Sequence, residues 1–350
     1  MKDLKYLAAM SIPYAAIVSI HDKGLMSFVT VFFAFVVIPI LELLLPQDIS
    51  NYKGDIRERK KNSLIYDLFL YLNIPVVFCI VFYALWKTTK DIYATYELIG
   101  VILSVGFVLA VNGINVAHEL GHRQASPQRY LGKLLLLPSL YMHFYIEHNF
   151  GHHARAATKE DPATAKYNQS VYSYWVTSVP KQYLSAWKLQ LKMLRPKQLS
   201  FFSLQNDMFW FSVLQTSYLV LITFFFGWLG LLLALAFAIV GILLLETVNY
   251  IEHYGLRRKK LPSGRYERVK EIHSWNSNHL IGRAILFELT RHSDHHFKSS
   301  KKYQILDYHD SSPQMPFGYP TSMVLSLVPP LWFWIMNKRI PEEMRANVKN

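Results

Sequence analysis

The chain has 350 residues, of which 52% are hydrophobic and only 17% are charged. Because soluble domains usually carry about 25% charged residues, this composition argues against an ordinary soluble protein. The formal net charge is +13, but the cations lie in loops beside long apolar runs and no nucleic-acid-binding module is present, which argues against a nucleic-acid partner. The single cysteine, Cys79, excludes an internal disulfide and a four-cysteine metal site.

Six apolar runs follow one another along the chain, most of them close to the length of about 20 residues that crosses a bilayer. They cover residues 6–20, 25–45, 64–86, 92–117, 208–226 and 228–248. The first run is short and contains Pro13, and we interpret it as a retained helix because no clear signal-peptide cleavage site follows it. The helices of a soluble bundle should each carry a polar stripe, whereas LLLALAFAIVGILLL in the sixth run has none. The sequence therefore predicts an all-α integral membrane protein with six transmembrane helices.

The distribution of cations predicts the orientation of these helices. Residues 46–63, between the second and third runs, contain the cations Lys53, Arg57, Arg59, Lys60 and Lys61. Cytoplasmic loops accumulate Lys and Arg, so we expect this segment inside the cell. Six crossings then place both termini inside, together with a cytoplasmic cap formed by residues 119–206 and 249–350. We expect residues 1–350 to form one membrane-embedded domain.

Histidines are concentrated in three short motifs, AHELGHR, EHNFGHH and RHSDHH, and one more lies in NYIEHYG. Spacings of three or four residues place side chains on one face of an α-helix. The fourth and sixth runs end on the same side of the membrane, so we expect all four groups to meet at one cytoplasmic surface. The nine candidates are His118, His122, His148, His152, His153, His253, His292, His295 and His296.

This pattern predicts a metal site. Imidazole is the commonest protein ligand for Zn, Cu, Fe and Ni, and one ion rarely takes more than four or five protein ligands, so nine candidates indicate two ions. A ligating histidine usually donates its other ring N–H to a carboxylate or carbonyl. The candidate partners are Glu119, Glu147, Glu252 and Asp294. We give His273 and His279 lower priority as ligands and expect His21, His143 and His309 to be structural.

Three other metal-dependent functions are weighed against the same residues. HELGH matches the HExxH pattern of zinc proteases, so an intramembrane zinc metalloprotease is a remote alternative, although it would leave about six candidate histidines unused. A haem needs one or two axial histidines, usually within spans. A transport protein would place ionisable residues in the middle of its spans, and this chain has very few.

The motifs HELGHR, EHNFGHH, NYIEHYGL and LTRHSDHHF, with the tail PQMPFGYP, resemble the membrane-bound non-haem di-iron alkane 1-monooxygenase family. That family belongs to the histidine-rich fatty acid desaturase and hydroxylase superfamily, and the resemblance extends from the first run to about Asn337. It implies that the nine histidines hold two iron ions, and that this di-iron centre itself uses O₂ and two electrons to hydroxylate terminal carbons of alkanes or alkyl chains. Thr290 stands where glutamine is expected. The motifs describe the metal site, so hydroxylases or desaturases of aromatic methyl groups or fatty acyl chains stay open.

The two electrons must come from a partner, because the chain has no dinucleotide fingerprint and no cysteine set for an iron–sulfur centre. The resemblance implies rubredoxin, with an NAD(P)H-dependent reductase upstream, and a location in the bacterial inner membrane. Basic residues 256–270 and the KSSKK segment at residues 298–302 are hypothesised to dock the partner. An alkyl substrate dissolved in membrane lipid is expected to enter between the spans, where four phenylalanines could line its route: Phe28, Phe32, Phe33 and Phe35.

Overall fold

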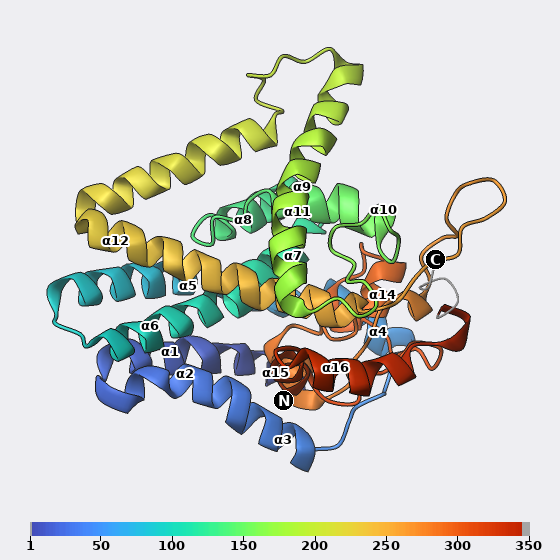
Figure 1. Ribbon diagram of the computed structural model, residues 1–350, viewed down its shortest axis with the longest axis horizontal. Coiled ribbons are helices and arrows are strands. Elements are labelled where there is room, and N and C mark those ends of the chain that lie inside the picture. The colour runs from blue at the N-terminus through green and yellow to red at the C-terminus, as the bar shows by residue number, and fades with distance from the viewer. Residues whose placement is uncertain (1, 345–350) are drawn as a thin grey trace.

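The computed structural model describes residues 2–344, and these residues form helices without any β-strand. Figure 1 shows the helices in chain order. Their bounds are α1 (Ser11–His21), α2 (Val29–Phe32), α3 (Ile38–Leu44), α4 (Gly54–Asn62), α5 (Ile65–Lys90), α6 (Thr95–Val108), α7 (Asn115–Gly121), α8 (Ser126–Leu135), α9 (Phe144–Glu147), α10 (His153–Arg155), α11 (Val171–Leu194), α12 (Asp207–His253), α13 (Leu280–Ile285), α14 (His292–Phe297), α15 (Tyr319–Ser326) and α16 (Pro329–Met336).

Four helical segments of the described residues are long and apolar enough to cross a membrane: Gly24–Leu44, Gly54–Lys90, Thr95–Gly121 and Asp207–His253. The first three contain nearly all of the second, third and fourth predicted runs. The last contains both the fifth and the sixth, because the chain turns sharply at Gly227 (φ 65°, ψ −169°) and α12 folds back as two arms (Figure 1). The all-α membrane class is therefore confirmed, whereas the number of six crossings stays a prediction.

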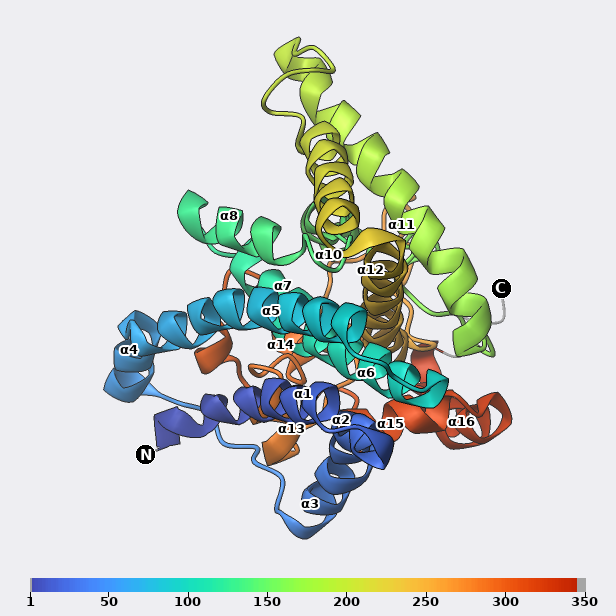
Figure 2. The ribbon, with the colours of Figure 1, turned by 90° about the vertical axis from the view of Figure 1, so that its left-hand side faces the viewer.

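The run at residues 6–20 forms a continuous helical segment, in which the 3₁₀ helix η1 (Lys2–Met10) leads into α1. It is not among the four membrane-span candidates of the described residues. It nevertheless packs against α5 and α6 inside the bundle (Figure 2).

Helix α6 and the second arm of α12 form the centre of the bundle, with α1 and α5 packed beside them (Figure 2). Small residues allow this close approach. A Cβ on Gly106 would lie 2.2 Å from Val240 Cγ1, and one on Gly241 would lie 2.9 Å from Leu109 Cβ. Such small residues are typical of packed membrane helices, because lipid provides no hydrophobic force between them.

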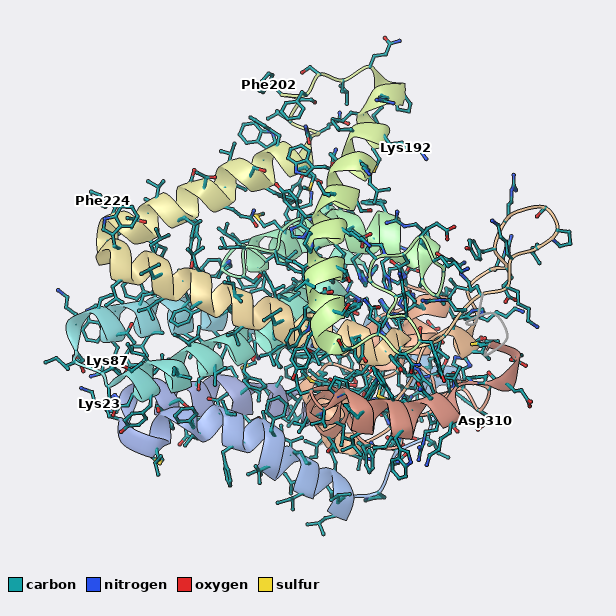
Figure 3. The ribbon with its side chains drawn as sticks, in the orientation of Figure 1. Lys23, Lys87, Lys192, Phe202, Phe224 and Asp310 are labelled. Atoms are coloured by element: carbon teal, nitrogen blue, oxygen red, sulfur yellow. The ribbon has the colours of Figure 1, made fainter. Side chains whose placement is uncertain are left out.

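The two ends of the bundle differ in character. The loop at Lys23, the end of α5 near Lys87 and the turn beside Phe224 all lie at one end (Figure 3). Helices α10 and α14 and the irregular C-terminal segments form a cap at the other end (Figure 1). A series of buried ion pairs ties the cap to the N-terminus: the Glu288 carboxylate accepts hydrogen bonds from Arg283 Nε and Lys5 Nζ, both at 2.6 Å.

Candidate metal centre

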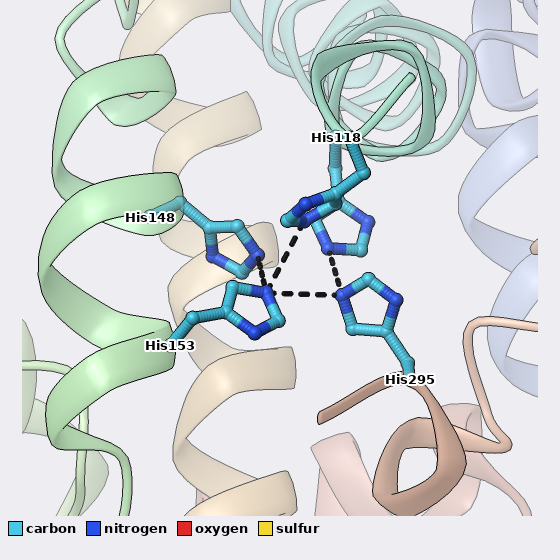
Figure 4. Close-up of side chains that lie close together, drawn as sticks. His118, His148, His153 and His295 are labelled. Atoms are coloured by element: carbon cyan, nitrogen blue, oxygen red, sulfur yellow. Dashed lines mark hydrogen bonds between the residues drawn. The ribbon is translucent and has the colours of Figure 1, made fainter. Parts of the chain in front are cut away.

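The structure brings all nine predicted histidines together in two clusters at the cap end of the bundle. One ligand nitrogen from each ring lies within 4.8 Å of those of the other rings in its cluster. Cluster one contains His118, His122, His148, His153 and His295, and cluster two contains His152, His253, His292 and His296. Figure 4 shows how rings from three separate parts of the chain point toward one another in cluster one.

A π-helical turn, η5 (His148–His152), decides which rings share a cluster. The π geometry pairs residues five apart, so His148 Nε2 lies 3.0 Å from His153 Nε2 (Figure 4). His152 instead turns into cluster two, where its Nε2 lies 3.2 Å from His296 Nε2. The expectation that His148 and His152 share one α-helical face is therefore wrong.

The motif RHSDHH, which contains His292, His295 and His296, also contributes rings to both clusters. On α14, His292 and His296 are four residues apart, and their Nε2 atoms lie 3.0 Å from each other in cluster two. The intervening His295 turns to cluster one, where its Nε2 lies 2.9 Å from His118 Nε2 (Figure 4). Because two motifs supply rings to both clusters, the clusters must be direct neighbours.

The spacing of the rings fits metal coordination. Seven Nε2–Nε2 contacts, each between two rings of the same cluster, measure 2.9–3.2 Å. Two nitrogens bound to one ion at about 2.0–2.1 Å would be about 2.9 Å apart at a right angle and about 3.4 Å apart at a tetrahedral angle. The observed distances lie between these values, so the donor sets suit metal ions without a large rearrangement.

The surroundings keep these rings in the form that binds metals. Burial lowers the pKa of His122, His148 and His292 well below 6.5, and repulsion from neighbouring imidazoles lowers it further. Burial lowers the pKa of His295 to about 3. Metal ligation requires neutral imidazole, and these low pKa values keep the rings of His122, His148, His292 and His295 neutral at physiological pH.

Asp161 contacts a cluster ring, and the sequence analysis missed it. Its Oδ2 lies 2.9 Å from Nδ1 of His152, and Thr164 Oγ1 and Ala163 N donate to the same carboxylate. Burial alone would raise the pKa of Asp161, but His152 and these hydrogen bonds keep it below its usual range. A carboxylate behind an imidazole fixes the orientation of that ring for metal binding. The only sequence signal was an acid in the short loop that follows EHNFGHH.

Of the four acids predicted from the sequence, only Glu252 contacts a cluster. Its Oε2 lies 3.3 Å from His292 Nε2, and its Oε1 accepts a hydrogen bond from Tyr319. Among the described residues, the other three form their ion pairs elsewhere: Glu119 with Arg123, Glu147 with Arg155, and Asp294 with Lys301 and His309.

Five histidines lie outside both clusters. His273 Nδ1 accepts a hydrogen bond from the backbone N–H of Lys270, and His279 Nδ1 lies 2.8 Å from Ser277 Oγ. Neither lower-priority candidate is therefore placed with the nine. The remaining three are His21, His143 and His309.

Comparisons with known proteins point to one family. The fatty acid desaturase family model matches residues 94–322. Alkane 1-monooxygenase 1 of Pseudomonas aeruginosa is 37% identical over 343 residues, which cover 95% of this chain and 88% of the relative. Alkane 1-monooxygenase 2 of Alcanivorax borkumensis is 35% identical over 349 residues, covering 97% and 91%. The chain belongs to the alkane 1-monooxygenase family. The xylene/toluene monooxygenase hydroxylase component of Pseudomonas putida is more distant, at 27% identity over 87% of this chain and 80% of its own.

In this member of the alkane 1-monooxygenase family, an apolar cavity lies between the helices, close to the clusters. Its lining includes Ile12, Ile38 and Ile285. A small pocket bounded by His118, His148 and His292 adjoins it, because the two share four lining residues: Asn115, Leu245, Val248 and Leu289. The small pocket, which borders rings of both clusters, therefore lies next to the cavity.

At its other side, the cavity adjoins an open apolar groove between α6, α12 and α15. The two share Phe35, Phe107, Leu244 and Met323. The rings of Phe35 and Phe107 pack edge to face with centroids 5.1 Å apart. Of the four phenylalanines considered from the sequence, Phe35 is the one that lines both hollows, whereas Phe32 is 58% exposed on the outside of the helix.

The hypothesised docking segment at residues 256–270 is only partly available to a partner. Arg257 and Arg258 are each only 8% exposed. Arg258 donates to the carbonyl oxygens of Ala154 and Glu267, so it holds the cap together. The expectation that both arginines form a basic surface is therefore wrong, and the exposed cations of this segment begin at Lys259.

Proposed function

We propose that this chain hydroxylates terminal carbons of alkanes or alkyl chains to primary alcohols, using O₂ and two electrons. The observation that carries the proposal is an apolar cavity that shares lining residues with an open groove on one side and with a pocket bounded by His118, His148 and His292 on the other. An unactivated C–H bond offers nothing that a side chain can attack. Bound metal supplies the oxygen-activating chemistry.

We propose that the metal is iron and that each cluster holds one ion. Imidazole donors suit iron, and five and four histidines are suitable numbers of protein ligands for one ion each. Asp161 would hold the His152 ring in place. Glu252 lies beside His292 Nε2 at 3.3 Å, where it would either complete the ligand set of cluster two or hold a proton near it.

The remaining residues would bind and orient the substrate. Burial of each CH₂ group in the cavity contributes roughly 0.8 kcal/mol, so affinity would rise with chain length until the cavity is full. Asn115 and Asn249 line the small pocket beside the clusters. Asn115 donates a side-chain N–H to Leu286 O, and Asn249 donates one to the Glu246 carboxylate. Each amide thus has one donor engaged within the protein, which would reduce its attraction for water and favour an alkyl end at the clusters.

We further propose that residues 1–350 act as one domain in the bacterial inner membrane, with both clusters on the cytoplasmic side. Three observations support this: the histidines of both clusters come from segments spread over the chain, among them α7, η5, α12 and α14; the N-terminal Lys5 pairs with Glu288 in the cap; and the loops at Lys23 and Lys87 lie at the opposite end from the cap. Electrons would come from rubredoxin and its NAD(P)H-dependent reductase, because the described chain offers no second redox site.

The zinc protease alternative is disfavoured by the surroundings of Glu119. In the HExxH pattern the glutamate must act as a general base beside the metal. Here its carboxylate pairs with Arg123 at 3.1 Å and accepts a hydrogen bond from Tyr303 N. It is therefore held away from the histidines that flank it in the sequence.

Metal and product analysis tests the proposed function. Protein purified in detergent is expected to contain about two irons per chain and to convert octane to 1-octanol when supplied with O₂ and reduced rubredoxin. Hexadecane and p-xylene in parallel reactions test chain length and the aromatic-methyl alternative, which the distant xylene/toluene relative motivates. One zinc per chain with no alcohol formed would contradict the proposal.

A further inference from the structure

Helix α11 separates an apolar surface from a basic groove. On one side, Trp175 lines the open apolar groove together with Leu243. On the other side, Ser173, Thr177 and Lys181 line a second groove, which lies between α11 and the segment that follows α10. Lys192, near the far end of α11, projects away from the first arm of α12 (Figure 3). The two grooves therefore lie on different sides of α11.

This second groove carries an excess of positive charge. Its lining contains two carboxylates, Glu160 and Asp161, and six cations: Arg155, Lys159, Lys166, Lys181, Lys188 and Lys192. The three lysines of α11 are exposed and have no ion-pair partner among the described residues. A surface of this kind attracts an acidic protein and steers its approach.

The floor of the groove touches cluster two. Asp161 and Thr164 line the groove, and the Asp161 carboxylate accepts the hydrogen bond from His152 Nδ1 at 2.9 Å. A protein bound in the groove would thus lie one hydrogen bond away from a ring of the cluster.

The other basic hollow of the cap is a weaker candidate. It is lined by Arg57, Arg123 and the cations of the KSSKK segment. Arg57 and Lys301 both pair with Asp307, and Arg123 pairs with Glu119. Internal carboxylates thus neutralise several of these charges, and the described residues show no hydrogen bond from this hollow to a cluster ring.

We propose that the groove between α11 and residues 159–166 is the docking site for an acidic one-electron carrier protein. This inference rests on the proposed function, which consumes two electrons per turnover. Two reduced carriers each lose one electron. With these two electrons and two protons, one O₂ and one alkyl C–H group yield one C–OH group and one water.

Charge reversal on α11 tests the docking site. The variant carries Lys181→Glu, Lys188→Glu and Lys192→Glu, and the probe is an acidic rubredoxin with the iron-loaded full chain in nanodiscs. The Kd is expected to rise about tenfold or more, since three attractive charges become repulsive. The rate of rubredoxin reoxidation is expected to fall, and the salt dependence of binding to weaken. The matched control reverses Lys259, Lys260 and Arg265, which lie outside the groove, and is expected to change the Kd less than about threefold.

Two further measurements distinguish a failure of the proposed function from a failure of the proposed docking site. Single turnover with dithionite bypasses the carrier, and 1-octanol yields are expected to be equal in all variants. If the parent protein forms no alcohol with dithionite, the proposed function fails while the binding comparison still stands. An unchanged Kd in the α11 variant, or an equal loss in the control, would overturn the docking site. So would an α11 variant that loses only its binding to anionic-lipid vesicles, since the lysines would then serve the membrane surface.

Discussion

Among the carboxylates of residues 2–344, Asp161 is the one that accepts a hydrogen bond from the Nδ1 of a cluster ring. We expect Asp161→Asn to weaken metal binding at cluster two about 10- to 100-fold, since the amide no longer favours the ring tautomer with Nε2 free for a metal. Iron titration against a competing chelator measures this affinity. Glu160→Gln removes the same charge from the neighbouring residue and is expected to have little effect. Equal losses in both variants would show that charge, and not orientation, matters.

The Phe35–Phe107 pair stands where the open groove meets the buried cavity. Removing the Phe35 ring should widen that passage. We expect Phe35→Ala to raise kcat/KM for alkanes with a bulky cyclohexyl end about tenfold relative to octane, a change of about 1.4 kcal/mol in selectivity. Competition between the two substrates measures the ratio directly. Phe32→Ala is the matched control on the lipid-exposed face, and an identical shift there would contradict the assignment.

At the scale of elements, Glu288 joins η1 to the segment after α13. Phe287 and Glu288 both adopt positive φ, at 49° and 59°, which is a strained conformation for residues other than glycine. The carboxylate is buried, and burial would raise its pKa, but Lys5 and Arg283 lower it to about 2. Its ion pairs thus stabilise a backbone arrangement that local preferences oppose.

This contact should make stability depend on pH. The pKa of Glu288 falls from 4.5 to about 2 on folding, so its contribution is complete above about pH 4.5 and is lost as the pH falls toward 2. We expect Glu288→Gln to destabilise the apoprotein by about 3 kcal/mol at pH 7, and the difference from the parent to shrink below pH 4.5. Denaturant unfolding in detergent at several pH values measures this. Glu58→Gln, at an exposed pair with Lys61, should show almost no difference, and a pH-independent loss in Glu288→Gln would exclude the ion pair as the cause.

The elements also show what sequence could and could not predict. Long apolar runs predict helices because their length and composition suit no other structure in lipid. The histidine motifs predicted all nine residues of the two clusters. The division of rings between clusters could not be predicted, because helical spacing assumes 3.6 residues per turn and η5 is π-helical. The Asp161 contact depends on how one loop closes. Arg258 was misjudged because charge suggests exposure, whereas backbone carbonyls satisfy it inside the cap.

At the scale of the whole molecule, the helical bundle and the cap offer two different environments, one apolar and one basic, and the proposed chemistry needs both. The apolar groove opens on the side of the helices, and the basic groove opens on the cap. A hydrocarbon and an electron carrier would then approach the clusters from different phases without competing for one entrance. The arrangement depends on the cap lying in the cytoplasm, where reduced carrier proteins are made.

That orientation makes a prediction for accessible thiols. Because Cys79 is the single cysteine, Cys79→Ala gives a background in which one introduced thiol reports one position. Asp22 precedes Lys23, and Trp228 follows the sharp turn at Gly227 beside Phe224, so both positions belong to the end of the bundle opposite the cap (Figure 3). Ser263 is exposed in the turn between Leu261 and Arg265. Each of the three is replaced by cysteine in turn. Cations near the 46–63 segment favour a cytoplasmic cap, so a membrane-impermeant reagent should label the first two in intact spheroplasts and the third only after lysis. Labelling of Asp22→Cys but not Trp228→Cys before lysis would mean that the two arms of α12 do not cross, and the reverse pattern at Ser263→Cys would place both histidine clusters outside the cell.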